Sequence, residues 1–66
     1  MNLSDLNNYT RSKIIEYLHD NKMSVNAFAK QVGVFQPNLL VFLNGKTLSS
    51  KSLEKIWAYF ESRGVK

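Results

Sequence analysis

Residues 24–46 decide the fold of this chain, and they read SVNAFAKQVGVFQPNLLVFLNGK. Apolar residues recur at the i, i+3, i+4 and i+7 spacing that places them on one face of a helix: Val25, Phe28, Ala29 and Val32. Ser24 precedes them, and its hydroxyl suits an N-cap because it can accept a hydrogen bond from a free backbone N–H of the first turn. Gly33 follows, and glycine adopts the left-handed conformation that ends a helix at almost no cost. The sequence therefore predicts a short helix between Ser24 and Gly33.

A second short helix is expected from Gln36 to Leu43. Pro37 fits only the first turn of a helix, where its missing N–H is not needed. The Asn-Gly pair at 44–45 ends the helix because both residue types tolerate positive φ. The apolar residues expected to face the core are Leu39, Phe42 and Leu43. Two short helices joined by a glycine-containing turn of about three residues indicate a helix-turn-helix motif at about residues 24–43.

Helical apolar spacing also flanks this motif, without the alternation typical of a strand. One helix is expected over about residues 5–21, with Ser4 or Thr10 as N-cap, and another begins after a cap at Ser49 or Ser50. The apolar residues expected on their buried faces are Leu6, Tyr9, Ile14, Ile15 and Leu18 on the first, and Leu53, Ile56, Trp57 and Phe60 on the second. We therefore expect residues 1–66 to form a single all-α domain, a compact bundle of four to five short helices.

Positive charge is unevenly distributed along the chain. The net charge is +4, yet no Asp or Glu occurs between Asn21 and Leu53. The basic residues of this acid-free stretch are Lys22, Lys30, Lys46 and Lys51. A polyanion such as DNA is the natural partner of such a surface, and a merely solvated basic face is the alternative.

Several functional classes fit the composition poorly. The chain has 66 residues, no cysteine and a single histidine, His19, so we expect no metal site, no cofactor, no small-molecule substrate and no enzyme activity. The longest apolar run, Leu39–Leu43, is far shorter than the roughly 20 residues of a membrane span. The first residues lack the basic and apolar segments of a signal peptide, so a cytoplasmic location without membrane contact is expected.

The order and spacing of these features resemble the lambda repressor and Cro family over residues 23–60. The resemblance rests on Ala29-x-x-x-Gly33, on Leu39, on Asn-Gly-Lys at 44–46 and on the helix that carries Leu53 and Ile56. It implies a sequence-specific transcriptional regulator, a Cro-like repressor of phage or mobile-element origin. Such a protein binds double-stranded operator DNA as a homodimer and represses by occupying the operator.

The same resemblance implies that the Gln36–Leu43 helix is the recognition helix, which enters the major groove. The implied base-reading residues are Gln36, Pro37, Asn38, Leu40 and Val41. Gln36 suits a bidentate contact to adenine, whereas Leu40 and Val41 suit thymine methyl groups. The implied phosphate contacts are Ser24, Lys30, Asn44, Lys46, Thr47 and Lys51.

Three departures from the family pattern make the expected DNA-reading face apolar. Phe35 stands where a capping Ser or Thr is common, Val25 where a glutamine is common, and Pro37 where a polar groove residue is common. One alternative is therefore a protein-interaction module, similar to an antirepressor, that uses Phe35, Leu40 and Val41 to bind a protein. Another is an architectural DNA binder without sequence preference.

Overall fold

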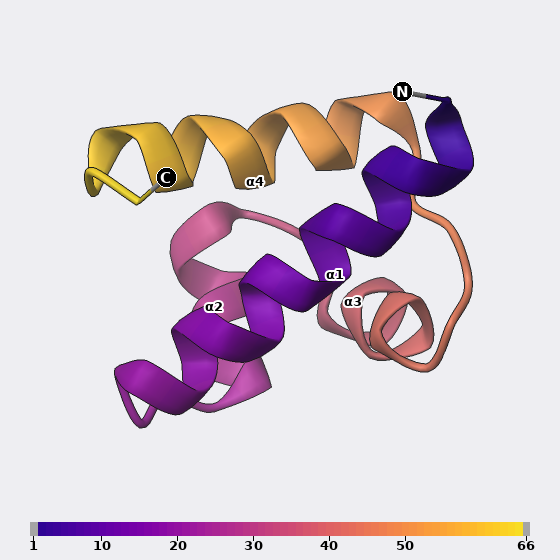
Figure 1. The fold of residues 1–66 in the computed structure, drawn as a ribbon. Helices are drawn as coiled ribbons and strands as arrows, with labels where there is room; N and C mark the ends of the chain where they lie inside the picture. The colour runs from indigo at the N-terminus through magenta and orange to yellow at the C-terminus, as the bar shows by residue number, and fades with distance from the viewer. Residues whose placement is uncertain (1, 66) are drawn as a thin grey trace.

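The computed structural model describes residues 2–65, in which helices are the only regular secondary structure. The elements, drawn in Figure 1, are α1 (Leu3–Asp20), α2 (Val25–Val32), α3 (Gln36–Leu43) and α4 (Ser50–Ser62). This architecture confirms the all-α bundle, with four helices in the described range. None of the helices in residues 2–65 has the length and apolar character that crossing a membrane requires.

Helix α1 is the longest element and crosses the whole molecule (Figure 1). In that view α4 lies along the upper edge, α2 lies beside the second half of α1, and α3 is seen nearly end-on. Each helix contributes apolar side chains to the core, and the buried apolar residues are Ile14, Phe28, Ala29, Leu39, Phe42, Leu48, Leu53, Ile56, Tyr59 and Phe60. All four helices and the loop before α4 thus share one core.

Aromatic rings fill the part of the core where α1, α2 and α4 meet. The ring centroid of Phe28 lies 5.8 Å from that of Tyr17 and 5.4 Å from that of Tyr59. Phe60 approaches Tyr17 to 5.4 Å in a tilted arrangement. A few large rings bury much apolar area per residue, which suits a chain too short to build a larger core.

The predicted start and buried face of α1 are partly wrong. The N-cap is Asn2, whose Oδ1 accepts a hydrogen bond of 2.8 Å from the Asp5 N–H, and not Ser4 or Thr10. Tyr9 and Ile15 are exposed, although helical spacing placed them near the buried face. The ring of Tyr9 instead stacks on Trp57 at 5.7 Å.

Two polar residues of α1 occupy buried positions that the apolar pattern did not predict. Asn7 Oδ1 accepts a hydrogen bond of 3.1 Å from the Leu48 N–H. Thr10 Oγ1 accepts one of 2.9 Å from Trp57 Nε1 and donates one of 2.7 Å to the Leu6 carbonyl oxygen. Burial of these polar groups is tolerated because their hydrogen bonds are made within the protein.

Candidate nucleic-acid interface

Helix α2 begins and ends where the sequence predicts. Ser24 Oγ accepts a hydrogen bond of 3.1 Å from the Ala27 N–H and so caps the first turn. Gly33 adopts the left-handed conformation, with φ of 87°, and its N–H donates to the Ala29 carbonyl oxygen at 2.9 Å. The next N–H, of Val34, bonds to the same oxygen at 3.0 Å, so the chain turns sharply. This turn lets α3 pack directly against α2.

Helix α3 also has its predicted bounds, with an unusual start. Phe35 is the N-cap residue and offers no side-chain hydrogen bond to the free N–H groups of the first turn. Pro37 lies in that turn and removes one of those N–H groups. The helix ends at Leu43, and of the Asn-Gly pair that follows, Gly45 has positive φ, 109°, whereas the C-cap residue Asn44 has φ of −87°.

The two sides of α3 differ in burial, although both carry apolar residues. The residues turned to the core are Leu39 and Phe42, which are buried, and Leu43, which is half-buried. On the other side Leu40 is 41% exposed and Val41 49% exposed. Pro37 and Asn38 are also exposed, and Gln36 is half-buried at the start. All five predicted base-reading residues are thus at least partly accessible, and the middle of their surface is apolar.

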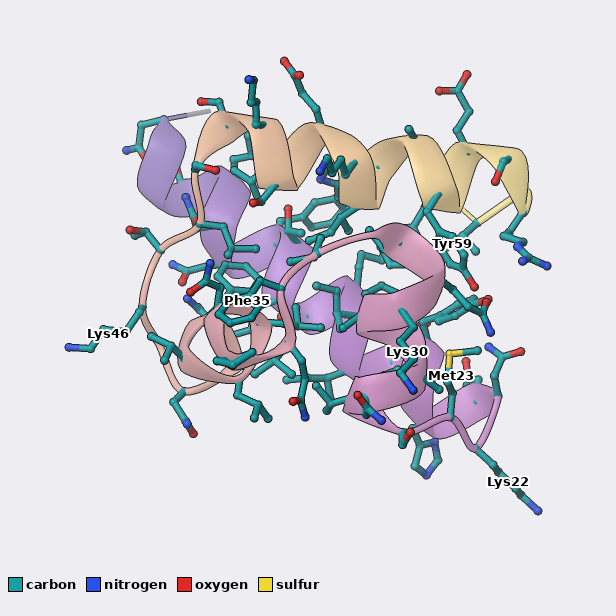
Figure 2. The ribbon with its side chains drawn as sticks, turned by 180° about the vertical axis from the view of Figure 1, so that it is seen from behind. Lys22, Met23, Lys30, Phe35, Lys46 and Tyr59 are labelled. Carbon is teal, nitrogen blue, oxygen red and sulfur yellow. The ribbon has the colours of Figure 1, made fainter. Side chains whose placement is uncertain are left out.

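The predicted phosphate contacts all lie at the surface, but not all lie near α3. Every residue of this set is exposed: Ser24, Lys30, Asn44, Lys46, Thr47 and Lys51. In Figure 2, Phe35, which is 67% exposed, projects between Lys46 and Lys30, whereas Lys22 extends from the far end of the molecule. Lys51 lies in the first turn of α4, beyond the loop that leaves α3. The acid-free stretch therefore places two lysines, Lys30 and Lys46, on either side of the start of α3.

Arg11, which the sequence did not single out, links α1 to the end of α3 and to the loop that follows. Its Nε donates to the Phe42 carbonyl oxygen and its Nη2 to the Lys46 carbonyl oxygen, each at 2.7 Å. Its Nη1 donates to Asn8 Oδ1 at 2.7 Å, and its guanidinium carbon lies 4.8 Å from the centroid of the Phe42 ring. Arg11 thereby fixes the end of α3 and the backbone that carries Lys46.

Lys55 is a second basic residue that packing brings to the motif. Its Nζ donates a hydrogen bond of 3.4 Å to the Gly33 carbonyl oxygen, in the turn between α2 and α3. Arg11 and Lys55 both lie outside the acid-free stretch, so the distribution of charge along the sequence gave no signal for either.

Two tyrosines, Tyr17 of α1 and Tyr59 of α4, support α2 from the core. Tyr59 OH donates a hydrogen bond of 2.7 Å to Gln31 Oε1 and lies 2.9 Å from Tyr17 OH. Burial, together with the hydrogen bond to Tyr17, raises the pKa of Tyr59 above the ordinary tyrosine value. The neutral phenol is thus favoured where α1, α2 and α4 meet.

Comparison with known proteins agrees with this geometry. The model of one protein family, the Cro/C1-type helix-turn-helix DNA-binding domain, matches residues 13–63, which contain α2, α3, α4 and α1 from Lys13 onward. That family is one of DNA-binding domains and not of enzymes. No curated protein and no solved structure matches the chain significantly.

Proposed function

The chain belongs to the Cro/C1-type helix-turn-helix DNA-binding family, and from that premise we propose that it is a sequence-specific transcriptional regulator. The observation that carries the proposal is the accessible side of α3, whose N-cap residue Phe35 lies between Lys30 and Lys46 in Figure 2, within a stretch that contains no acidic residue. A helix entering the major groove needs an accessible face, and the phosphates on either side of the groove attract cations.

In this proposal α3 is the recognition helix. The base-reading residues are Gln36, Pro37, Asn38, Leu40 and Val41, and the phosphate contacts come from Ser24, Lys30, Asn44, Lys46, Thr47 and Lys51. Phosphate contacts fix the position of the protein, whereas contacts to base edges select the sequence. The link from Arg11 to the Lys46 carbonyl oxygen supports this arrangement because it holds the phosphate-binding loop in a fixed position beside α3.

The proposed regulator is a single-domain, Cro-like repressor of phage or mobile-element origin that acts in the cytoplasm. It binds as a homodimer and blocks transcription by occupying its operator. Two recognition helices then enter successive major grooves on one side of the duplex, so the half-sites lie about 34–36 Å apart.

Selection from a random duplex library at near-physiological salt tests this function. The purified chain is mixed with the library, and the bound DNA is sequenced over several rounds. We expect an enriched, two-fold symmetric site whose half-sites are about one helical turn apart. An enriched single half-site would contradict binding as a homodimer and would remain consistent with a sequence-specific regulator. A pool without enrichment would contradict the proposed function.

A second candidate function is favoured by the exposed apolar residues Phe35, Leu40 and Val41. A protein-interaction module, similar to an antirepressor, would use these side chains to bind a protein partner. Salt separates the two candidates, because DNA affinity falls steeply as salt displaces the protein from phosphates. Absence of any salt-dependent affinity for duplex DNA would favour the protein-interaction module.

A further inference from the structure

The outward surface of α3 is poor in hydrogen-bonding groups at its centre. Pro37, Leu40 and Val41 lie opposite the buried Leu39 and Phe42, and none of the three side chains carries a donor or an acceptor. The side-chain amides lie at the margins of this surface: Gln36 at the half-buried start of the helix, Asn38 to one side and the C-cap residue Asn44 at the end. We call Pro37, Leu40 and Val41 the apolar face of α3.

The floor of the major groove offers such a face only one matching group. Base edges there present hydrogen-bond donors, acceptors and the C5 methyl group of thymine. An apolar side chain over a donor or an acceptor displaces water without replacing its hydrogen bonds, which is unfavourable. Over a methyl group the same side chain buries apolar area, which is favourable.

We propose that Leu40 and Val41 recognise pyrimidine C5 methyl groups in the major groove, so that the chain selects its site largely by methyl contacts. This inference rests on the proposed function and goes further, because it makes methyl contacts the main source of site selection and extends them from thymine to any pyrimidine with a C5 methyl group. It predicts half-sites in which the positions facing the middle of α3 carry a C5-methylated pyrimidine on one strand.

Charge favours DNA over a protein partner as the occupant of this face. Lys30 and Lys46 lie on either side of Phe35, the N-cap residue of α3, in Figure 2, and no Asp or Glu occurs from Asn21 to Leu53. An apolar strip within a basic, acid-free stretch is complementary to a major groove, where methyl groups lie on the floor and phosphates line both rims.

Two bases supply this chemistry, because 5-methylcytosine carries its methyl group at the same ring position as thymine. The apolar face contacts the methyl group and not the donors or acceptors of the pyrimidine ring. We therefore expect 5-methylcytosine to be preferred over cytosine at the positions where thymine is preferred over uracil.

The test begins with the duplex enriched by library selection. Each thymine is replaced in turn by deoxyuridine, which removes one methyl group and keeps the base pair. We expect the wild-type chain to lose about fourfold in affinity at one or two positions per half-site, the value of one buried methylene-sized group. A second set of duplexes carries cytosine or 5-methylcytosine at those positions, and a similar gain is expected on methylation.

Protein variants assign the effect to residues. Leu40→Ala and Val41→Ala shorten exposed side chains, so both variants are expected to fold, and thermal unfolding verifies this. For each variant, at one of the sensitive positions, we expect the same affinity for the duplex with thymine and for the duplex with uracil. Ile15→Ala is the matched control, because Ile15 is an apolar residue on α1 that is at least as exposed as Leu40 and Val41, and it should keep the fourfold difference.

The possible outcomes distinguish a failure of methyl recognition from a failure of the proposed regulatory function. An enriched site that binds equally well with and without every methyl group would overturn methyl recognition and leave the regulator standing. Methyl dependence that persists unchanged in both variants would overturn the assignment to Leu40 and Val41, because methyl groups then act through DNA shape. A library without any enriched site would overturn the regulator and the inference together.

Discussion

Arg11 donates hydrogen bonds to three oxygen atoms, one on α1, one at the end of α3 and one in the loop that follows. Only a guanidinium presents several N–H groups in a fixed, planar fork. Lysine can reach one of these acceptors but cannot hold all three in the same geometry. The position of Lys46 therefore depends on a residue 35 positions earlier in the chain.

Replacing Arg11 with lysine should lower the free energy of unfolding by about 1–3 kcal/mol, because the hydrogen bond from a charged group to the part-buried Phe42 carbonyl oxygen is lost. Urea unfolding measures the change. Ser12→Ala, at an exposed position on the same helix, is the control and should stay within about 0.5 kcal/mol of wild type. An Arg11→Lys variant as stable as the wild type would show that the fork is not required.

Gln36→Ala tests base reading at the start of α3. On the selected site, we expect a loss of about 1–3 kcal/mol in binding free energy and relaxed preference at one base pair. Affinities measured on single-base variants of the site locate that pair. Equal weakening on every duplex would mean that Gln36 selects no base.

Lys46→Ala tests phosphate contact. Affinity should fall to the same extent on all duplexes, and the slope of log affinity against log salt should decrease by about one, because one fewer counterion is released. Lys22→Ala is the matched control: Lys22 belongs to the same acid-free stretch but lies at the far end of the molecule (Figure 2), so its slope should not change. A wild-type slope in the Lys46 variant would exclude this contact.

At the scale of elements, the ends of α2 show how local chemistry sets a helix. Ser24 caps its start, and Gly33 ends it with positive φ. A Cβ added at Gly33 would have no neighbouring atom within 4 Å. The requirement for glycine there is consequently a matter of backbone conformation and not of space.

Gly33→Ala should therefore destabilise the fold by about 1 kcal/mol, the cost of the left-handed conformation for a residue with a Cβ. Gly33→Asn should cost less, since asparagine tolerates this conformation better. Denaturant unfolding of the two variants gives the comparison. Equal stability of Gly33→Ala and wild type would mean that the turn relaxes to negative φ.

The bounds of α2 and α3 were predictable because their signals lie within a few residues of each helix end, and of the two serines expected as caps of α4, Ser49 and Ser50, the structure uses Ser49. The buried face of α1 was not. Asn7 and Thr10 are buried there because their partners, Leu48 and Trp57, lie 41 and 47 positions away. Spacing of apolar residues along one helix carries no information about such pairings, so Tyr9 and Ile15 were wrongly placed.

At the scale of the whole molecule, Tyr59 connects three helices. Its ring packs on Phe28 of α2, and its hydroxyl lies against Tyr17 of α1 and Gln31 of α2. Burial, with the Tyr17 hydrogen bond, raises its pKa, so the folded state favours the neutral phenol. The accessibility of the predicted DNA-contacting residues was foreseeable, but the supports behind them at Tyr59, Arg11 and Lys55 arise only from packing.

A raised pKa sets the pH dependence of stability. The contribution of Tyr59 is fully present below the ordinary tyrosine pKa of 10.0 and is lost as pH rises through the higher pKa of the folded state. The free energy of unfolding should therefore fall above about pH 10, and more steeply in the wild type than in Tyr59→Phe. Urea unfolding of both proteins from pH 8 to 11 compares the slopes, and identical slopes would contradict the role given to Tyr59.

Contact between DNA and the outward surface of α3, together with the lysines beside it, is open to a direct measurement. Titration of isotope-labelled protein with the selected duplex, followed by backbone amide NMR, maps the contact residue by residue. The largest shifts are expected at residue 36 and residues 38–41, at Lys30 and at Lys46, because Pro37 has no amide N–H to observe, whereas the exposed Tyr9 and Ile15 of α1 should scarcely shift. Largest shifts at Tyr9 and Ile15, with α3 unchanged, would contradict that contact.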